Sequence, residues 1–157
     1  MTTPRDNPGV LAPPPLIFLG FLLIGWGIGH LLNEPSMGLT TEVRRGLAFA
    51  FVIVGLVTEM TALGGFRRVG TAPEPWKPTT ALVTGGLYRF SRNPIYVGFT
   101  LIYVGFAFAM DSWAALAMVL PCLVIIDRAV ILREEAYLAG KFGAEWDAYR
   151  SKVRRWL

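Results

Sequence analysis

The sequence predicts an all-α integral membrane protein of about four transmembrane helices, followed by an amphipathic C-terminal helix. Composition is the first indication, because hydrophobic residues make up 54% of the 157 residues and charged residues only 17%, against about 25% charged in soluble domains. The mean hydropathy of +0.48 agrees. The distribution of these residues is the second indication, since they gather in four apolar stretches separated by polar segments.

The first two expected spans occupy residues 16–66. Residues 16–32 carry no formal charge and contain four glycines, which let helices approach closely within a bilayer. Residues 46–66 are interrupted only by Glu59. The preceding residues 1–15 are Pro-rich and polar, and no small-residue cleavage site follows the first apolar run. We therefore expect a retained helix behind a short N-terminal tail rather than a signal peptide.

The last two expected spans, residues 95–110 and 113–126, are short. The sixteen residues of the former rise only about 24 Å, less than a hydrocarbon core of about 30 Å. One continuous helix over residues 95–126 would place Asp111 near the bilayer centre, where a charge is costly. A helical hairpin that turns at Asp111 and Ser112 puts this polar pair at a surface instead. The sequence therefore favours a hairpin and four spans.

The positions of the basic residues predict the orientation. Thirteen Lys and Arg residues, beginning with Arg5, flank one side of the four spans, and only Arg44 and Arg45 flank the other. The positive-inside rule places both termini and the central loop, residues 67–94, in the cytoplasm of a multi-pass cell (inner) membrane protein. The net charge of the chain is +4. Its basic residues lie beside the spans and form no basic patch interleaved with aromatic residues. It predicts contact with the lipid bilayer and not with nucleic acid.

Two further segments have a recognisable pattern. Three prolines, Pro73, Pro75 and Pro78, predict that the first half of the central loop is extended. In the tail, apolar residues recur at steps of three and four and form one stripe of a helix that Gly143 breaks or caps midway. The stripe consists of Leu138, Phe142, Trp146, Tyr149, Val153 and Trp156. The single cysteine excludes an intramolecular disulfide and a cysteine-based zinc site, so no metal is expected.

The central loop ends in a run that could bind an anion. Residues 82–98 read LVTGGLYRFSRNPIYVG. Pro94 suits the first turn of a helix, Asn93 can cap that helix, and the positive helix end beside Arg92 favours a carboxylate. Tyr88 and Tyr96 offer flat faces for a planar ring. The alternative is simpler: arginines beside a span are usually topology signals, and an Asn-Pro pair usually marks a helix start.

Glu134 and Glu135 are adjacent carboxylates near the end of the fourth span. They could hold an ammonium group or ribose hydroxyls, or accept a proton. The alternative is a solvated helix face whose ion pairs are worth little. Glu59 and His30 are ionisable residues of the first two spans, where such residues indicate function by default, although both lie near enough to a span end to reach water.

Three segments together resemble a known superfamily. Residues 86–98, 133–138 and 142–149, arranged around a two-span hairpin, are similar to the isoprenylcysteine carboxyl methyltransferases and phospholipid methyltransferases, which are integral membrane enzymes. The resemblance covers roughly residues 66–157. It implies a helical membrane fold without a Rossmann domain, in which residues 67–157 bind S-adenosylmethionine, transfer its methyl group to a lipid-like or apolar acceptor and release S-adenosylhomocysteine.

The resemblance also implies the site residues. Those expected around the cofactor are Leu82, Val83, Thr84, Gly86, Leu87, Tyr88, Arg92, Asn93, Pro94, Tyr96, Gly98, Glu134 and Glu135. Arg92 and Glu135 are the expected catalytic residues. Arg92 would orient a carboxylate acceptor, whereas Glu135 would act as base or proton relay for an amine acceptor.

The sequence leaves the identity of the methyl acceptor open. Many isoprenylcysteine enzymes have His where this chain has Asn93, and the Arg-Asn-Pro form also resembles phospholipid N-methyltransferases. A phospholipid amine, an isoprenylcysteine-type carboxylate and a small thiol are all compatible, and we expect an apolar acceptor to enter sideways from the bilayer. Membrane sterol reductases, which bind a nicotinamide cofactor, share part of the pattern but are far longer. A non-catalytic scaffold or lipid-binding protein is the remaining alternative.

Overall fold

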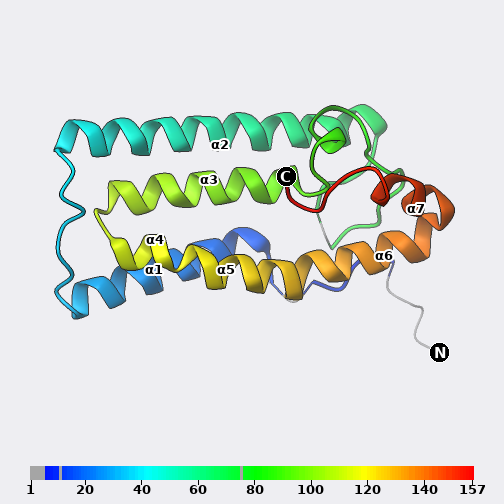
Figure 1. Ribbon diagram of the computed structural model, residues 1–157. Coiled ribbons are helices and arrows are strands. Elements are labelled where there is room, and N and C mark those ends of the chain that lie inside the picture. Colours follow the sequence, from blue (N-terminus) through cyan, green and yellow to red (C-terminus); the bar gives the residue numbers. More distant parts are fainter. Residues whose placement is uncertain (1–5, 11, 75) are drawn as a thin grey trace.

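The computed structural model describes residues 6–10, 12–74 and 76–157, and over these residues the protein is helical, without strands (Figure 1). The first two helices are long, and the third is shorter. In chain order the elements are α1 (Pro14–Leu31), α2 (Thr41–Val69), the 3₁₀ turn η1 (Gly86–Arg89), α3 (Pro94–Ala109), α4 (Trp113–Ala117), α5 (Val119–Ile125), the π-helical turn η2 (Ile126–Ile131), α6 (Leu132–Phe142) and α7 (Ala144–Arg150). The expected all-α membrane class is confirmed.

Three helices are long and apolar enough to cross a membrane: α1, α2 and a continuous helix over Trp113–Phe142. The fourth apolar helix, α3, has 16 residues. The fourth span was expected to end at Ile126, and the helix itself continues past this residue, because α4, α5, η2 and α6 follow one another along Trp113–Phe142. Charged side chains end the apolar run after Ile126, but a helix ends only at a stop signal such as Gly143, which has a φ of 50°.

The helices form three layers, with α3 in the middle (Figure 1). α2 packs along one side of α3, and α1 with the α4–α5 segment packs on the other. Glycines allow the α2–α3 contact. A Cβ atom at Gly55 would lie 2.8 Å from the Gly98 carbonyl oxygen, and one at Gly105 would lie 2.8 Å from the Ala48 carbonyl oxygen. The two backbones therefore touch directly, as is common where helices meet within a bilayer.

The predicted hairpin turn lies at Asp111 and Ser112. Asp111 has a φ of 55°, and the Ser112 hydroxyl caps α4 by accepting a 3.0 Å hydrogen bond from the Ala115 N–H. The Asp111 carboxylate accepts hydrogen bonds from the Met37 N–H (3.1 Å) and the Ser36 hydroxyl (2.8 Å). These bonds lower the pKa of Asp111. The α3–α4 turn is thus tied to the α1–α2 loop at one end of the bundle.

The other end of the bundle carries the central loop and the tail. The first half of the loop is not helical, as expected; Pro75 and the topology residue Arg5 lie outside the described residues. The C-terminal stripe lies on two helices, α6 and α7, that meet at Gly143, where a break or cap was expected. The expected helix does not extend to Val153 and Trp156, because residues 151–157 are not helical. Its aromatic residues Trp146 and Tyr149 pack with Val83 and Tyr88 of the loop. The tail therefore covers the loop and brings two distant segments together.

Candidate active site

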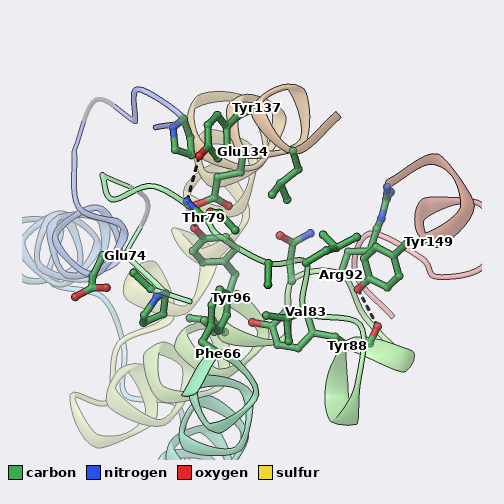
Figure 2. A pocket seen from close by; sticks show the side chains of 18 residues that line it. Phe66, Glu74, Thr79, Val83, Tyr88, Arg92, Tyr96, Glu134, Tyr137 and Tyr149 are labelled. Carbon is green, nitrogen blue, oxygen red and sulfur yellow. Dashed lines mark hydrogen bonds between the residues drawn. The ribbon is translucent and has the colours of Figure 1, made fainter. Parts of the chain in front are cut away.

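A cavity opens where the central loop meets the ends of α2, α3 and α6 (Figure 2). Phe66 of α2, Tyr88 of η1, Tyr96 of α3, Glu134 of α6 and Tyr149 of α7 contribute to its walls. Segments far apart in the sequence thus converge on one cavity. The walls are mostly aromatic and apolar, with a small number of charged groups.

The structure brings about half of the predicted site residues to this cavity. Those that line it are Leu82, Val83, Tyr88, Arg92, Asn93, Tyr96 and Glu134. The others lie nearby but not in the lining: they are Thr84, Gly86, Leu87, Pro94, Gly98 and Glu135. Thr84 lines a separate surface pocket, Gly98 lies at the α2–α3 contact, and Pro94 is the first residue of α3.

Tyr96 and Glu134 form the polar part of the wall. The Tyr96 hydroxyl donates a 2.7 Å hydrogen bond to a Glu134 oxygen. The tyrosine is almost fully buried. The contact fixes the carboxylate at the cavity and leaves its other oxygen for a ligand.

Arg92 belongs to a chain of ion pairs. One of its terminal nitrogens lies 3.3 Å from Glu135, and Arg155 binds the other Glu135 oxygen at 2.7 Å and Asp127 at 3.2 Å. The Arg92 guanidinium lies over the Trp146 ring, 5.7 Å from its centroid. Its Nε is buried and has no hydrogen-bond partner among the described residues. Glu135 therefore holds the Arg92 guanidinium in place beside the Trp146 ring.

Asn93 has a different role from the expected one. It stands at the N-cap position of α3, but its side chain makes no capping hydrogen bond. Its amide instead donates a 2.9 Å bond to the Arg155 carbonyl oxygen, and the Arg92 N–H donates to the Arg154 carbonyl oxygen at 2.9 Å. The C-terminal segment is thus fixed beside the start of α3, which places Arg155 against Glu135.

Tyr137 closes one side of the cavity and was not expected there. Its hydroxyl donates to Asp6 (2.9 Å) and accepts from the Thr79 N–H (3.1 Å), the latter marked in Figure 2. Lys141 also binds Asp6, at 2.7 Å, and together these contacts lower the pKa of Asp6. Pro8 lines the cavity as well. The N-terminal tail therefore forms part of the wall.

Tyr88 and Tyr149 form the opposite wall. The Tyr149 hydroxyl donates a 2.8 Å hydrogen bond to the Tyr88 carbonyl oxygen (Figure 2). Burial raises the pKa of both tyrosines well above the usual value near 10. Both hydroxyls are therefore neutral at physiological pH, and these residues supply ring surface and fixed dipoles rather than a base.

Comparison with known proteins identifies the family. The phospholipid methyltransferase family model matches residues 43–145, which include the whole central loop, the hairpin and α6. The chain belongs to this family. Over 72 residues it is 35% identical to the protein-S-isoprenylcysteine O-methyltransferase of Schizosaccharomyces pombe, a stretch that covers 46% of this chain but only 30% of the yeast protein. An uncharacterized protein of Haemophilus influenzae is 36% identical over 63 residues, which are 40% of this chain and that protein's whole length.

The family match extends across most of the cavity. The phospholipid methyltransferase family model includes Phe66, Tyr88, Arg92, Tyr96 and Glu134. Tyr149 and the ion-pair partner Arg155 lie beyond its last residue. The family match thus covers α3, the helix through α6 and most of the cavity lining, whereas α1, Pro8 and Tyr149 lie outside it.

Proposed function

We propose that the protein transfers a methyl group from S-adenosylmethionine to a lipid-like acceptor, and that the cavity beside Arg92 binds this cofactor. The observation that carries the proposal is that one cavity brings together Arg92, Glu134 and the rings of Phe66, Tyr88 and Tyr96. A guanidinium group in a cavity wall can bind a ligand carboxylate. The family to which the chain belongs supports the same donor, because methyltransferases of this kind generally use it.

The other cavity residues fit the rest of such a ligand. Glu134 offers a carboxylate oxygen for an ammonium group or ribose hydroxyls, and the rings of Phe66, Tyr88 and Tyr96 offer flat apolar surface for a purine. The bound cofactor would supply a methyl group on a positively charged sulfur. The protein's own contribution would be alignment and the exclusion of water, which such a transfer needs more than covalent help.

The roles of the charged residues follow from their contacts. Arg92 would bind the cofactor carboxylate, and Glu135 would be a positioning residue that acts through Arg92, because its oxygens pair with two guanidinium groups. The alternative is the expected role of Glu135 as a base. Kinetic measurements distinguish a base from a positioning residue. The acceptor would be a phospholipid amine or an isoprenylcysteine-type carboxylate, with a thiol as the other option, and the site would face the cytoplasm if the positive-inside rule holds.

Calorimetry with detergent-purified protein tests the proposal. The unaltered protein should bind S-adenosylmethionine and S-adenosylhomocysteine. Arg92→Lys keeps a positive charge but removes the guanidinium group, and should weaken binding about tenfold, the effect of one lost charged hydrogen bond. Arg89→Lys is the matched control, because Arg89 lies three residues away and lines another pocket. No binding by the unaltered protein would refute the proposal and favour a non-catalytic membrane protein.

A further inference from the structure

A second pocket, with a basic lining, lies where the central loop meets the end of α7. Arg89 at the end of η1 and Lys152 just after α7 are its charged residues, and Thr84 of the loop adds a hydroxyl group. Of the residues that line the cavity in the described structure, only Tyr149 also lines this pocket. The basic pocket is therefore a separate site and not an extension of the proposed cofactor site.

The charge of this pocket is of one sign. No Asp or Glu belongs to the part of its lining that the structure describes. Within the described part of the chain, neither Arg89 nor Lys152 forms an ion pair, whereas Arg150 of α7 pairs with Asp147 at 3.1 Å. Two cations from distant segments, brought to one pocket without a counter-charge, favour an anionic ligand.

The pocket lies at the level where α2 leaves the hydrocarbon core of the membrane. Residues 46–66 of α2 contain a single charged residue, and two arginines follow them directly. About 20 apolar residues span the core of a bilayer, so Phe66 marks its boundary. η1 packs beside this end of α2 (Figure 1), with the Tyr88 ring centroid 5.7 Å from that of Phe66. Arg89, the next residue, is therefore at the depth of the lipid headgroups.

Phe90 indicates that this surface faces lipid. It directly follows Arg89 and its side chain is 72% exposed. Exposure of a whole phenyl ring to water is unfavourable, but at a membrane boundary an exposed aromatic ring inserts among the lipid chains while neighbouring cations stay with the headgroups. The basic pocket and the exposed ring thus fit the two parts of one lipid molecule.

We propose that the basic pocket binds the headgroup of an anionic phospholipid. Arg89 and Lys152 would contact its phosphate, the Thr84 hydroxyl would donate a hydrogen bond, and Phe90 would lie among the acyl chains. Phosphatidylglycerol carries a net negative charge that complements the two cations, whereas the ammonium group of phosphatidylcholine cancels the charge of its phosphate. The inference goes beyond the proposed function, because it concerns another ligand at another site and requires neither S-adenosylmethionine nor methyl transfer.

Native mass spectrometry of the purified protein in mixed micelles tests the binding. The micelles contain phosphatidylcholine and an increasing mole fraction of phosphatidylglycerol, and the half-saturating fraction is the one at which half of the protein retains phosphatidylglycerol. We expect retention of phosphatidylglycerol over phosphatidylcholine. Arg89→Gln and Lys152→Gln should each raise the half-saturating fraction about fivefold, the effect of one lost cation at an anionic membrane surface. Both side chains are exposed, so neither change should lower the melting temperature in phosphatidylcholine.

Arg150→Gln is the matched control. It removes the same charge from the same part of the chain, but Arg150 does not line the pocket and already pairs with Asp147. Its half-saturating fraction should equal that of the unaltered protein. Thermal unfolding gives a second measurement, because a ligand that binds only the folded state raises the melting temperature. Phosphatidylglycerol should raise it in the unaltered protein and in Arg150→Gln, but not in the double variant Arg89→Gln, Lys152→Gln.

Three outcomes would overturn the inference. Equal retention of the two lipids would show that the pocket does not select an anionic headgroup. An equal shift in Arg150→Gln would mean that only the overall charge matters. Loss of bound phosphatidylglycerol on addition of millimolar inorganic phosphate would show that the pocket takes a soluble anion in place of a lipid. Failure of the proposed function would leave all of these measurements unchanged, because none of them involves S-adenosylmethionine.

Discussion

The Tyr96 hydroxyl lies 2.7 Å from Glu134 and donates a hydrogen bond to it, which joins α3 to α6. Tyr96 and Glu134 both line the cavity. The contact therefore holds the only cavity carboxylate of α6 in the described structure at the proposed cofactor site.

Replacement of Tyr96 by Phe should weaken S-adenosylmethionine binding several-fold. The change leaves the Glu134 carboxylate without its donor, which costs about 1–3 kcal/mol and frees the side chain to turn away. Calorimetry and a thermal melt measure both effects. Tyr103→Phe is the matched control, because that hydroxyl also lies on α3 but donates to the Ala115 carbonyl oxygen away from the cavity. Equal affinity in both variants would contradict the assigned role of Tyr96.

Glu135→Gln separates a positioning residue from a base. Loss of the shared counter-charge of Arg92 and Arg155 should lower stability by about 3–5 kcal/mol, as for other largely buried ion pairs. It should also raise the dissociation constant for S-adenosylmethionine several-fold while kcat for an amine lipid stays within about threefold, since Glu135 does not line the cavity. A collapse of kcat with unchanged affinity would instead make Glu135 the base.

Asp127→Asn is the control for this variant. Asp127 pairs with Arg155 at 3.2 Å but has no contact with Arg92 in the described ion pairs. The substitution should therefore lower the melting temperature without weakening cofactor binding. If Asp127→Asn weakened binding as much as Glu135→Gln, the effect would come from general loosening of the tail.

Most of the fold was predictable because the bilayer imposes it. Apolar run length predicted the four helices, and the cost of placing Asp111 in hydrocarbon predicted the hairpin turn. The end of the last helix was not predictable from the apolar run, because helix and hydrophobic run end for different reasons. The chain remains helical past Asp127 and stops at Gly143, where the backbone adopts a positive φ.

The site was predictable in part. The family resemblance pointed to Arg92, Tyr96 and Glu134, which do line the cavity. It could not rank Glu134 against Glu135, because neighbours on a helix point about 100° apart and only the packing of α6 shows which one faces the ligand space. Pro8 and Tyr137 were missed, since their place in the wall depends on contacts between the tail and α6 that no local pattern encodes.

The α2–α3 contact should depend on Gly55. Gly55→Ala places a methyl group 2.8 Å from the Gly98 carbonyl oxygen, and because both atoms belong to rigid helices the expected cost is about 1–3 kcal/mol. Gly64→Ala on the same helix meets no atom within 4 Å and should be neutral, or more stable by up to about 1 kcal/mol from helix propensity. Thermal unfolding in one detergent compares them, and equal melting temperatures would refute the close contact.

Lowering the pH should weaken the hydrogen bonds by which Asp111 joins the α3–α4 turn to the α1–α2 loop. The pKa of Asp111 is lowered by hydrogen bonds from Met37 and Ser36, so its contribution to stability is present above the unfolded pKa, about 3.9, and is lost as the pH falls through the folded value. Asp111→Asn keeps a residue that tolerates the positive φ of 55°. The wild-type protein should melt higher than this variant at pH 5–7, and the two should converge as the pH falls below about 4. If the difference in melting temperature between the two proteins persisted unchanged in acid, the Asp111 charge would contribute nothing to the stability of this contact.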